Sequence, residues 1–253
     1  MKRRDTERHH LFATKVFGEL GIFDIQGVLK EGEVFKCGIE AYQVFRFSEI
    51  DWGKVDQQGE ISRVRFCEFL KIPYYVVIRS EAEYRYKIFN ISIQSSKIVR
   101  ILKQDLSVPQ FLDWWRSNQS FDQRKSMYEA SSRIVNSLID SDLFSNHLAW
   151  GINVDGFMLD KSSQKVLAIF EKRIRTYKYG QYSVENYDPN AFFHGTQNRA
   201  GDFTSWSILF ELSLRLNARL VLLTFDTSER EKVGASIVKN VSKEGGLVYK
   251  NGL

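Results

Sequence analysis

The chain has 253 residues, of which 43% are hydrophobic and 14% aromatic, so it can build a sizeable core and is not an intrinsically disordered chain. Lys and Arg exceed Asp and Glu by 36 to 31, which gives a formal net charge of +5 and favours an anionic partner. Two cysteines and four histidines exclude a disulfide framework and leave little material for a Cys/His zinc site. We expect Cys37 and Cys67 to be buried, reduced thiols.

The sequence has no run of about 18 apolar residues, which a membrane-spanning helix would need. Its basic start, residues 1–5, is not followed by the apolar segment of a secretory signal. We therefore expect a cytoplasmic protein that has no membrane partner.

Hydrophobic spacing and turn residues predict six elements in the first part of the chain. Gly21 ends the first helix, Gly32 takes a positive φ in a hairpin turn, and Pro73 directs the chain into a buried strand. The predicted elements are a helix from Asp5 or Thr6 to Leu20, strands over 22–29 and 34–47, a helix over 62–71, and strands over 74–78 and 84–93.

The rest of the chain repeats this alternation of helices and strands. Pro109 lies in the first turn of a short helix, and the polar stretch over 180–202 is a long loop. The other predicted elements are a helix over 121–144, strands over 150–159 and 165–177, a helix from Asp202 or Thr204 to Asn217, and a buried strand over 220–225.

The two halves follow the same order of elements. Residues 23–28 align with 152–157, residues 38–42 with 169–173, and residues 66–78 with 210–222. We interpret this as an internal duplication with domains at 1–106 and 107–253. The predicted fold class is α/β, with two similar α/β/α units, each a small mixed sheet flanked by helices. The alternative is a chance similarity between two α/β segments.

Two carboxylates in the second half are candidates for chemistry. Asp155 lies on one strand of the second hairpin and Glu171 lies sixteen positions later on the next. Antiparallel pairing can bring both to one edge of the sheet, where they would hold Mg²⁺ or Mn²⁺. Arg173 lies two residues beyond Glu171, on the same face of the strand, where it can contact a phosphate.

This arrangement resembles the PD-(D/E)XK nuclease superfamily, the restriction-endonuclease-like fold. The resemblance rests on Asp155 before Gly156 and on the run Glu171-Lys172-Arg173. It implies a metal-dependent endonuclease that hydrolyses DNA, with Asp155 and Glu171 as metal ligands. Arg173 stands where the family has a catalytic lysine. Because its pKa lies above about 12, Arg173 cannot shuttle a proton, although it can bind phosphate.

The first half carries a weaker copy of the same pattern. Gln26 aligns with Asp155, Glu40 with Glu171, and Tyr42 takes the place of the cation. Asp24 is the alternative counterpart of Asp155, also sixteen positions before Glu40. Either alignment predicts a degenerate first copy without a complete metal site.

Basic and polar residues near the candidate site predict contacts with nucleic acid. A solvated strand end and a solvated loop are the alternative interpretations. Glu129, on the preceding helix, is a candidate for an additional metal carboxylate. The predicted nucleic-acid-binding residues are Lys172, Arg175, Lys178, His194 and Arg199.

The function predicted from these residues is a Mg²⁺- or Mn²⁺-dependent DNA endonuclease with Asp155, Glu171 and Arg173 as catalytic residues. The alternative is a catalytically inactive, nuclease-like subunit that binds nucleic acid or assembles a larger nucleoprotein complex. A third hypothesis is a scaffold for interactions with other proteins. In the purely structural interpretation, Asp155 is a turn residue and Glu171 pairs with Arg173 or Arg175. Protein partners and a homodimer both stay open.

Overall fold

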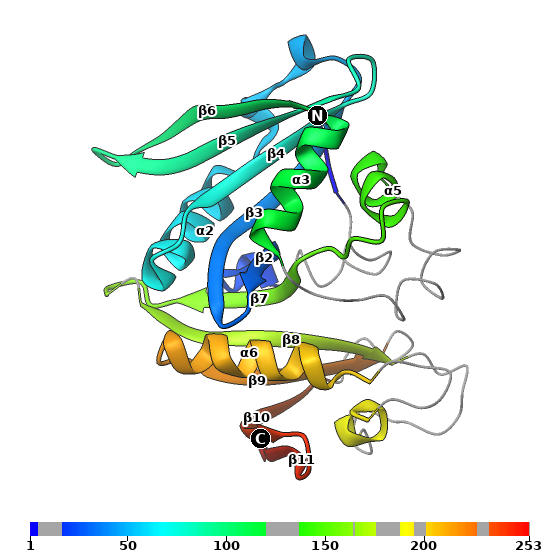
Figure 1. Cartoon of the computed structure of the whole chain (residues 1–253). Helices are drawn as coiled ribbons and strands as arrows, with labels where there is room; N and C mark the ends of the chain where they lie inside the picture. The colour runs from blue at the N-terminus through cyan, green and yellow to red at the C-terminus, as the bar shows by residue number, and fades with distance from the viewer. Residues whose placement is uncertain are drawn as a thin grey trace. The chain divides into compact units, whose positions relative to one another are not determined.

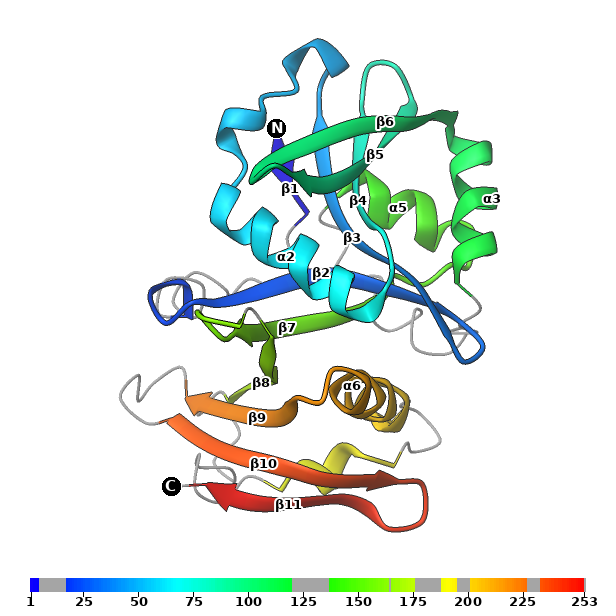
Figure 2. The ribbon, with the colours of Figure 1, turned by 90° about the vertical axis from the view of Figure 1, so that its left-hand side faces the viewer.

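The computed structural model describes residues 1–4, 17–119, 137–163, 165–175, 188–194, 201–226 and 233–252 (Figures 1 and 2). Its internal contacts divide the chain into two compact units, Met1–Asn153 and Val154–Leu253. Residues 107–153, which follow the seam expected near residue 107, therefore belong to the first unit.

The expected fold class is wrong. The described residues form a large mixed sheet of eleven strands with few helices, not two small sheets each flanked by helices. The sequence pattern does not predict three long strands of this sheet: β6 (Lys97–Ser107), β10 (Val233–Ser242) and β11 (Gly246–Gly252). β6 is largely exposed or half-buried, so its sequence lacks the apolar alternation by which a half-buried strand is recognised.

The first unit combines a β-hairpin with further strands and with helices. β2 and β3 are antiparallel, β4 runs parallel to β3, and β5 and β6 follow antiparallel, while β1 pairs with β3. Gly32 has a φ of +55° in the β2–β3 turn, as predicted. The remaining elements of this unit are β1 (Lys2–Arg3), β2 (Ile22–Glu31), β3 (Val34–Val44), η1 (Phe47–Glu49), η2 (Trp52–Lys54), α2 (Gln57–Leu70), β4 (Tyr74–Ser80), β5 (Arg85–Gln94), α3 (Val108–Asn118) and α5 (Leu138–Phe144).

Helix α2 covers one face of the first unit's strands and α3 the other. A Cβ placed on Gly38 of β3 would collide with the Cys67 sulfur of α2, whereas its neighbours Cys37 and Ile39 belong to the apolar cluster around α3. Successive residues of a strand point to opposite faces, so the two helices lie on opposite sides of β3. Helix α2 begins at Gln57, five residues before the predicted start at Ser62. The sequence pattern missed this first turn because it is polar and contains a glycine.

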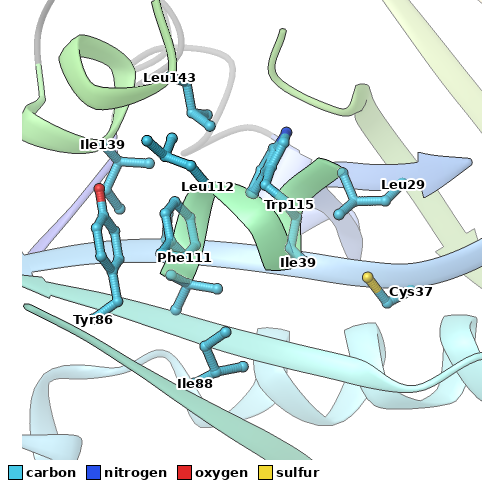
Figure 3. Packing of buried hydrophobic residues seen from close by; sticks show 12 residues of the cluster. Leu29, Cys37, Ile39, Tyr86, Ile88, Phe111, Leu112, Trp115, Ile139 and Leu143 are labelled. Atoms are coloured by element: carbon cyan, nitrogen blue, oxygen red, sulfur yellow. The ribbon is translucent and has the colours of Figure 1, made fainter. Parts of the chain in front are cut away.

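Helix α3 buries its apolar face in the core of the first unit (Figure 3). Phe111 and Trp115 are fully buried, and the Phe111 ring stacks on Tyr86 of β5 at 3.7 Å between centroids. Pro109 lies in the first turn, as predicted, and Ser107 and Gln110 form a capping box. These contacts explain why α3 belongs to the first unit.

The predicted long helix over 121–144 is not continuous. Residues 120–136 lie outside the described residues, and α5 begins only after Ser137. Ser137 has extended backbone angles, and its hydroxyl accepts the N–H of Asp140, as an N-cap residue does. For the first predicted helix, residues 17–19 are helical and Gly21 follows at a φ of +71°, while residues 5–16 lie outside the described residues.

The second unit follows the same topology as the first. β7 and β8 are antiparallel, β9 runs parallel to β8 after α6, and β10 and β11 follow antiparallel. Helix α6 packs against β8, β9 and β10. The remaining elements are β7 (Ile152–Leu159), where the division between the units falls, β8 (Val166–Arg175), η5 (Pro189–Phe192), α6 (Phe203–Arg215) and β9 (Arg219–Asp226).

Local details also recur between the units. Both helices end in a left-handed residue, Lys71 after α2 and Asn217 after α6. The next N–H in each case, from Ile72 or Ala218, donates to a carbonyl five residues earlier. This shared cap makes Lys71 equivalent to Asn217. The predicted alignment of 66–78 with 210–222 is therefore shifted by two residues from the alignment that the structure gives. A shift of two leaves the alternation of a strand unchanged, which is why the sequence pattern did not reveal it.

Two expectations from composition concern the thiols and the membrane. Cys37 and Cys67 are buried and free, as predicted, and burial raises the pKa of both thiols. Among the helices of the described ranges, none combines the length and the apolar composition that are needed to cross a bilayer.

Candidate active site

Asp155 and Glu171 occupy neighbouring positions where β7 and β8 begin to separate. The last backbone pair of this hairpin joins Gly156 to Phe170, so Asp155 and Glu171 face each other one step further along. Directly opposed residues of an antiparallel pair share a face of the sheet. At this step the Asp155 carboxylate accepts the N–H of Lys172 at 2.8 Å. The structure therefore places the Asp155 carboxylate beside the backbone that carries Glu171.

Arg173 joins this pair from the same strand. Its Nη2 lies 2.9 Å from Glu171 Oε1 and 3.1 Å from Asp202 Oδ2. Asp202 directly precedes α6, and Trp206, one turn into that helix, lies with its ring 5.6 Å below the Arg173 guanidinium. The Glu171–Arg173 ion pair is one of the two pairings that the purely structural interpretation expects. Asp202 and Trp206 complete the surroundings of Arg173.

The donor set at this position suits a hard divalent cation. Asp155 and Glu171 supply carboxylate groups from neighbouring positions of β7 and β8, and Mg²⁺ is typically held by one or two carboxylates together with water and substrate phosphates. Within the described ranges, no group of three or more His, Cys, Asp or Glu side chains gathers closely enough to enclose a metal ion. The residues therefore fit an open, two-carboxylate site, in which Arg173 is the cation that contacts Glu171.

The other predicted site residues are placed less completely. Lys172 lies on β8 and uses its backbone N–H to bind Asp155, and Arg175 is the last residue of that strand. His194 is exposed, and its ring meets the buried Phe193 edge-on. The predictions for Lys178, Arg199 and Glu129 lie outside the described residues.

In the first unit, the neutral side chain of Gln26 occupies the position that corresponds to Asp155. Gln26 Oε1 accepts the N–H of Ala41 at 2.7 Å, the same bond that Asp155 makes with Lys172. In both units the acceptor lies one residue before the last backbone pair of the hairpin, and the donor follows the equivalent glutamate. This match identifies Gln26, rather than Asp24, as the counterpart of Asp155.

Glu40, the counterpart of Glu171, is neutralised by arginines. Its side chain is fully buried, and it accepts Arg3 Nε at 2.6 Å and the N–H of Gln26 at 2.9 Å. Arg63 Nε of α2 lies 3.4 Å from Glu40 Oε1, the oxygen that also accepts the N–H of Gln26. A buried charge is tolerated only when it is paired and hydrogen-bonded, and these contacts meet that requirement.

Asp24 completes the first unit's charge cluster. Arg3 and Arg63 each bind its carboxylate at 2.9 Å. Burial alone would raise the pKa of Asp24, but the two guanidinium groups outweigh burial and hold this pKa below its ordinary value. Burial likewise lowers the pKa of Arg63, and Glu40 and Asp24 more than offset that effect. Arginines thus occupy the surroundings of these carboxylates.

Sequence reasoning missed three residues of these clusters: Arg3, Arg63 and Asp202. Arg63 falls inside a predicted amphipathic helix, where an arginine ordinarily faces solvent, and Asp202 was interpreted only as a helix cap. Arg3 reaches Glu40 from a strand of two residues, which no periodicity can reveal. No family model, curated protein or solved structure matches this chain.

Proposed function

We propose that the second unit is a metal-dependent endonuclease that hydrolyses phosphodiester bonds in DNA. The observation that carries the proposal is the placement of Asp155 and Glu171 at facing positions of β7 and β8, with Arg173 two residues further on the same strand. This is the arrangement on which the resemblance to the PD-(D/E)XK nucleases rests. It supports the assignment of these three residues as the catalytic set.

Each residue has a distinct task in this proposal. Asp155 and Glu171 would hold Mg²⁺ or Mn²⁺, which activates a water molecule and neutralises charge on the phosphodiester when bound. The N–H of Lys172 donates to the Asp155 carboxylate and holds it beside the strand that carries Glu171. Arg173 would contact the phosphate as a fixed positive charge, because a guanidinium does not exchange protons near neutral pH.

In this proposal the first unit has no catalytic task. An amide replaces the carboxylate at Gln26, and Arg3 and Arg63 neutralise Glu40. A divalent cation would have to displace two arginines from a fully buried glutamate in order to bind there. The first unit would instead contribute to substrate binding.

A second candidate function is a catalytically inactive, nuclease-like module that binds nucleic acid. The ion pair between Arg173 and Glu171 favours this reading, because the same side chain that would bind phosphate now contacts a metal ligand. The two candidates differ in their requirement for metal. An enzyme needs a divalent cation, whereas a binding module retains salt-sensitive affinity for nucleic acid without it.

The first test is cleavage of supercoiled plasmid and of single-stranded DNA by the full chain with Mg²⁺ or Mn²⁺. We expect wild type to cleave, and Asp155→Asn to lose at least about 100-fold in rate because it removes one of two metal carboxylates. Asp160→Asn is the matched control: Asp160 lies in the exposed turn of the same hairpin, where it caps Ser162 and Ser163.

Three results of this assay decide between the candidates. Loss of cleavage in Asp155→Asn, with full activity in Asp160→Asn, supports the endonuclease. Equal cleavage by wild type and Asp155→Asn contradicts it. Absence of cleavage, together with metal-independent and salt-sensitive DNA binding by both proteins, supports the inactive binding module instead.

A further inference from the structure

Arg173 is held from two directions, and only one of its acidic contacts was expected. Glu171 lies on its own strand, whereas Asp202 reaches it from the start of α6, and each contact is about 3 Å long. The Trp206 face adds a contact from the same helix, and that ring is almost fully buried. Helix α6 therefore fixes the place of Arg173 independently of Glu171.

Asp202 makes this contact instead of capping its helix. It occupies the N-cap position of α6, yet its side chain makes no capping hydrogen bond. Aspartate is among the best N-cap residues, and the capping bond stabilises a helix measurably. The carboxylate of Asp202 points to Arg173 rather than to the backbone of α6, which indicates a role in placing the guanidinium.

The first unit shows a partial parallel to this arrangement. Asp56 is the N-cap residue of α2, it is equivalent to Asp202 by the helix caps, and its side chain also makes no capping bond. A Cβ placed on Gly59 would contact both the Asp56 carboxylate and the guanidinium of Arg63, so these two groups are near neighbours. In each unit, an aspartate at the helix start thus lies close to the arginine that binds the equivalent glutamate.

We propose that Asp202 is a positioning residue for the nuclease reaction. It keeps Arg173 in place when Glu171 exchanges its contact with Arg173 for a contact with the metal ion. Arg173 then remains beside the metal site with its charge directed at the phosphate. This inference rests on the proposed function and adds a residue to it that neither the sequence motif nor the resemblance assigns.

The exchange predicts how Asp202 affects metal affinity. Arg173 and a divalent cation compete for Glu171, and Asp202 offers Arg173 an alternative carboxylate. Asp202→Asn removes this alternative, so Arg173 pairs more strongly with Glu171 and the metal binds less tightly. Because the ion pair is partly exposed, we expect the Kd for Mn²⁺ to rise about fivefold.

The test is calorimetric titration of the metal-free full chain with Mn²⁺. Asp202→Asn should weaken Mn²⁺ binding, and Asp202→Glu, which keeps the charge, should largely restore it. In an Arg173→Gln background, Asp202→Asn should have no further effect, because the competing cation is gone. Glu211→Gln is the matched control. It removes another carboxylate of α6, one that pairs with Arg215.

Two different results overturn the inference. One result is that wild type and Asp202→Asn bind Mn²⁺ equally well, or that Asp202→Asn weakens Mn²⁺ binding in the Arg173→Gln background as well. In either case Asp202 is not a positioning residue, and the proposed function stands. If wild type binds no Mn²⁺, the proposed function fails and the inference fails with it. Circular dichroism checks that each variant is folded, and Asp202→Ser, neutral but able to cap α6, replaces an Asn variant that does not fold.

Discussion

Gln26 and Asp155 make the same hydrogen bond with opposite consequences for charge. Each accepts a backbone N–H from the strand that carries the neighbouring glutamate. The amide adds no charge to its unit, whereas the carboxylate of Asp155 adds a negative charge beside Glu171. The two positions thus differ in one functional group. The carboxylate of Asp155 can attract a cation, whereas the amide of Gln26 is neutral and binds the backbone.

At the residue scale, Asp24 gives a prediction about pH. Its pKa is lowered in the folded chain by Arg3 and Arg63, while an unfolded aspartate titrates near 3.9. Asp24 therefore stabilises the fold fully above about pH 5, and this contribution declines progressively as the pH falls below about 4 toward the lowered pKa of the folded chain. Asp24→Asn should lower the free energy of unfolding by about 3 kcal/mol at pH 7 and by clearly less at about pH 2.

Urea unfolding of the full chain at both pH values measures this difference. Asp105→Asn serves as the control, because the Arg85–Asp105 pair is exposed on both sides and should contribute less than about 1 kcal/mol. A deficit in Asp24→Asn that is the same at about pH 7 and about pH 2 would mean that ionisation of this carboxyl does not contribute to the stability of the fold.

At the element scale, the two helix ends differ in how well their residues suit a left-handed backbone. Lys71 has a φ of +58° and Asn217 a φ of +50°. This conformation costs an ordinary L-residue about 1–2 kcal/mol, and asparagine adopts it more readily than lysine. Lys71→Gly should therefore raise the free energy of unfolding by about 0.5–1 kcal/mol, and Asn217→Gly by less.

Urea midpoints of the two variants check this order. Lys71→Ala, which keeps a Cβ, should show no gain and serves as the control. Equal or larger stabilisation by Asn217→Gly would contradict the explanation that asparagine adopts this left-handed conformation at a lower cost than lysine.

The elements that could be predicted from the sequence are those with a strong local pattern. The β2–β3 hairpin has Gly32 in its turn, and β4 follows Pro73 as a continuous apolar run. Strands β6, β10 and β11 lack such a pattern because much of their surface is exposed or half-buried. The predicted helix over 121–144 failed at Ser137 because a short polar residue caps a new helix there.

The candidate site was predictable only where its residues lie on one hairpin. Asp155, Glu171 and Arg173 are close in sequence, so strand pairing alone suggests that they meet. Asp202 reaches Arg173 from the next helix, across 29 positions, and its placement depends on how α6 packs. Contacts of that kind follow from tertiary packing, which periodicity does not encode.

At the scale of the whole molecule, one topology occurs twice with two different ways of balancing buried charge. In the first unit, arginines neutralise Glu40 and Asp24 completely within the protein. In the second unit, Asp155 accepts the N–H of Lys172, and Arg173 pairs with Glu171 and with Asp202. We therefore assign cation binding to the second unit alone.

The stoichiometry of Mn²⁺ binding to the full chain tests this assignment most directly. The account predicts one Asp155-dependent binding site in each chain, abolished by Asp155→Asn and retained by Asp160→Asn. Calorimetric titration measures both the number of sites and their dependence on Asp155. Absence of binding, two sites in each chain, or binding that survives Asp155→Asn would contradict it.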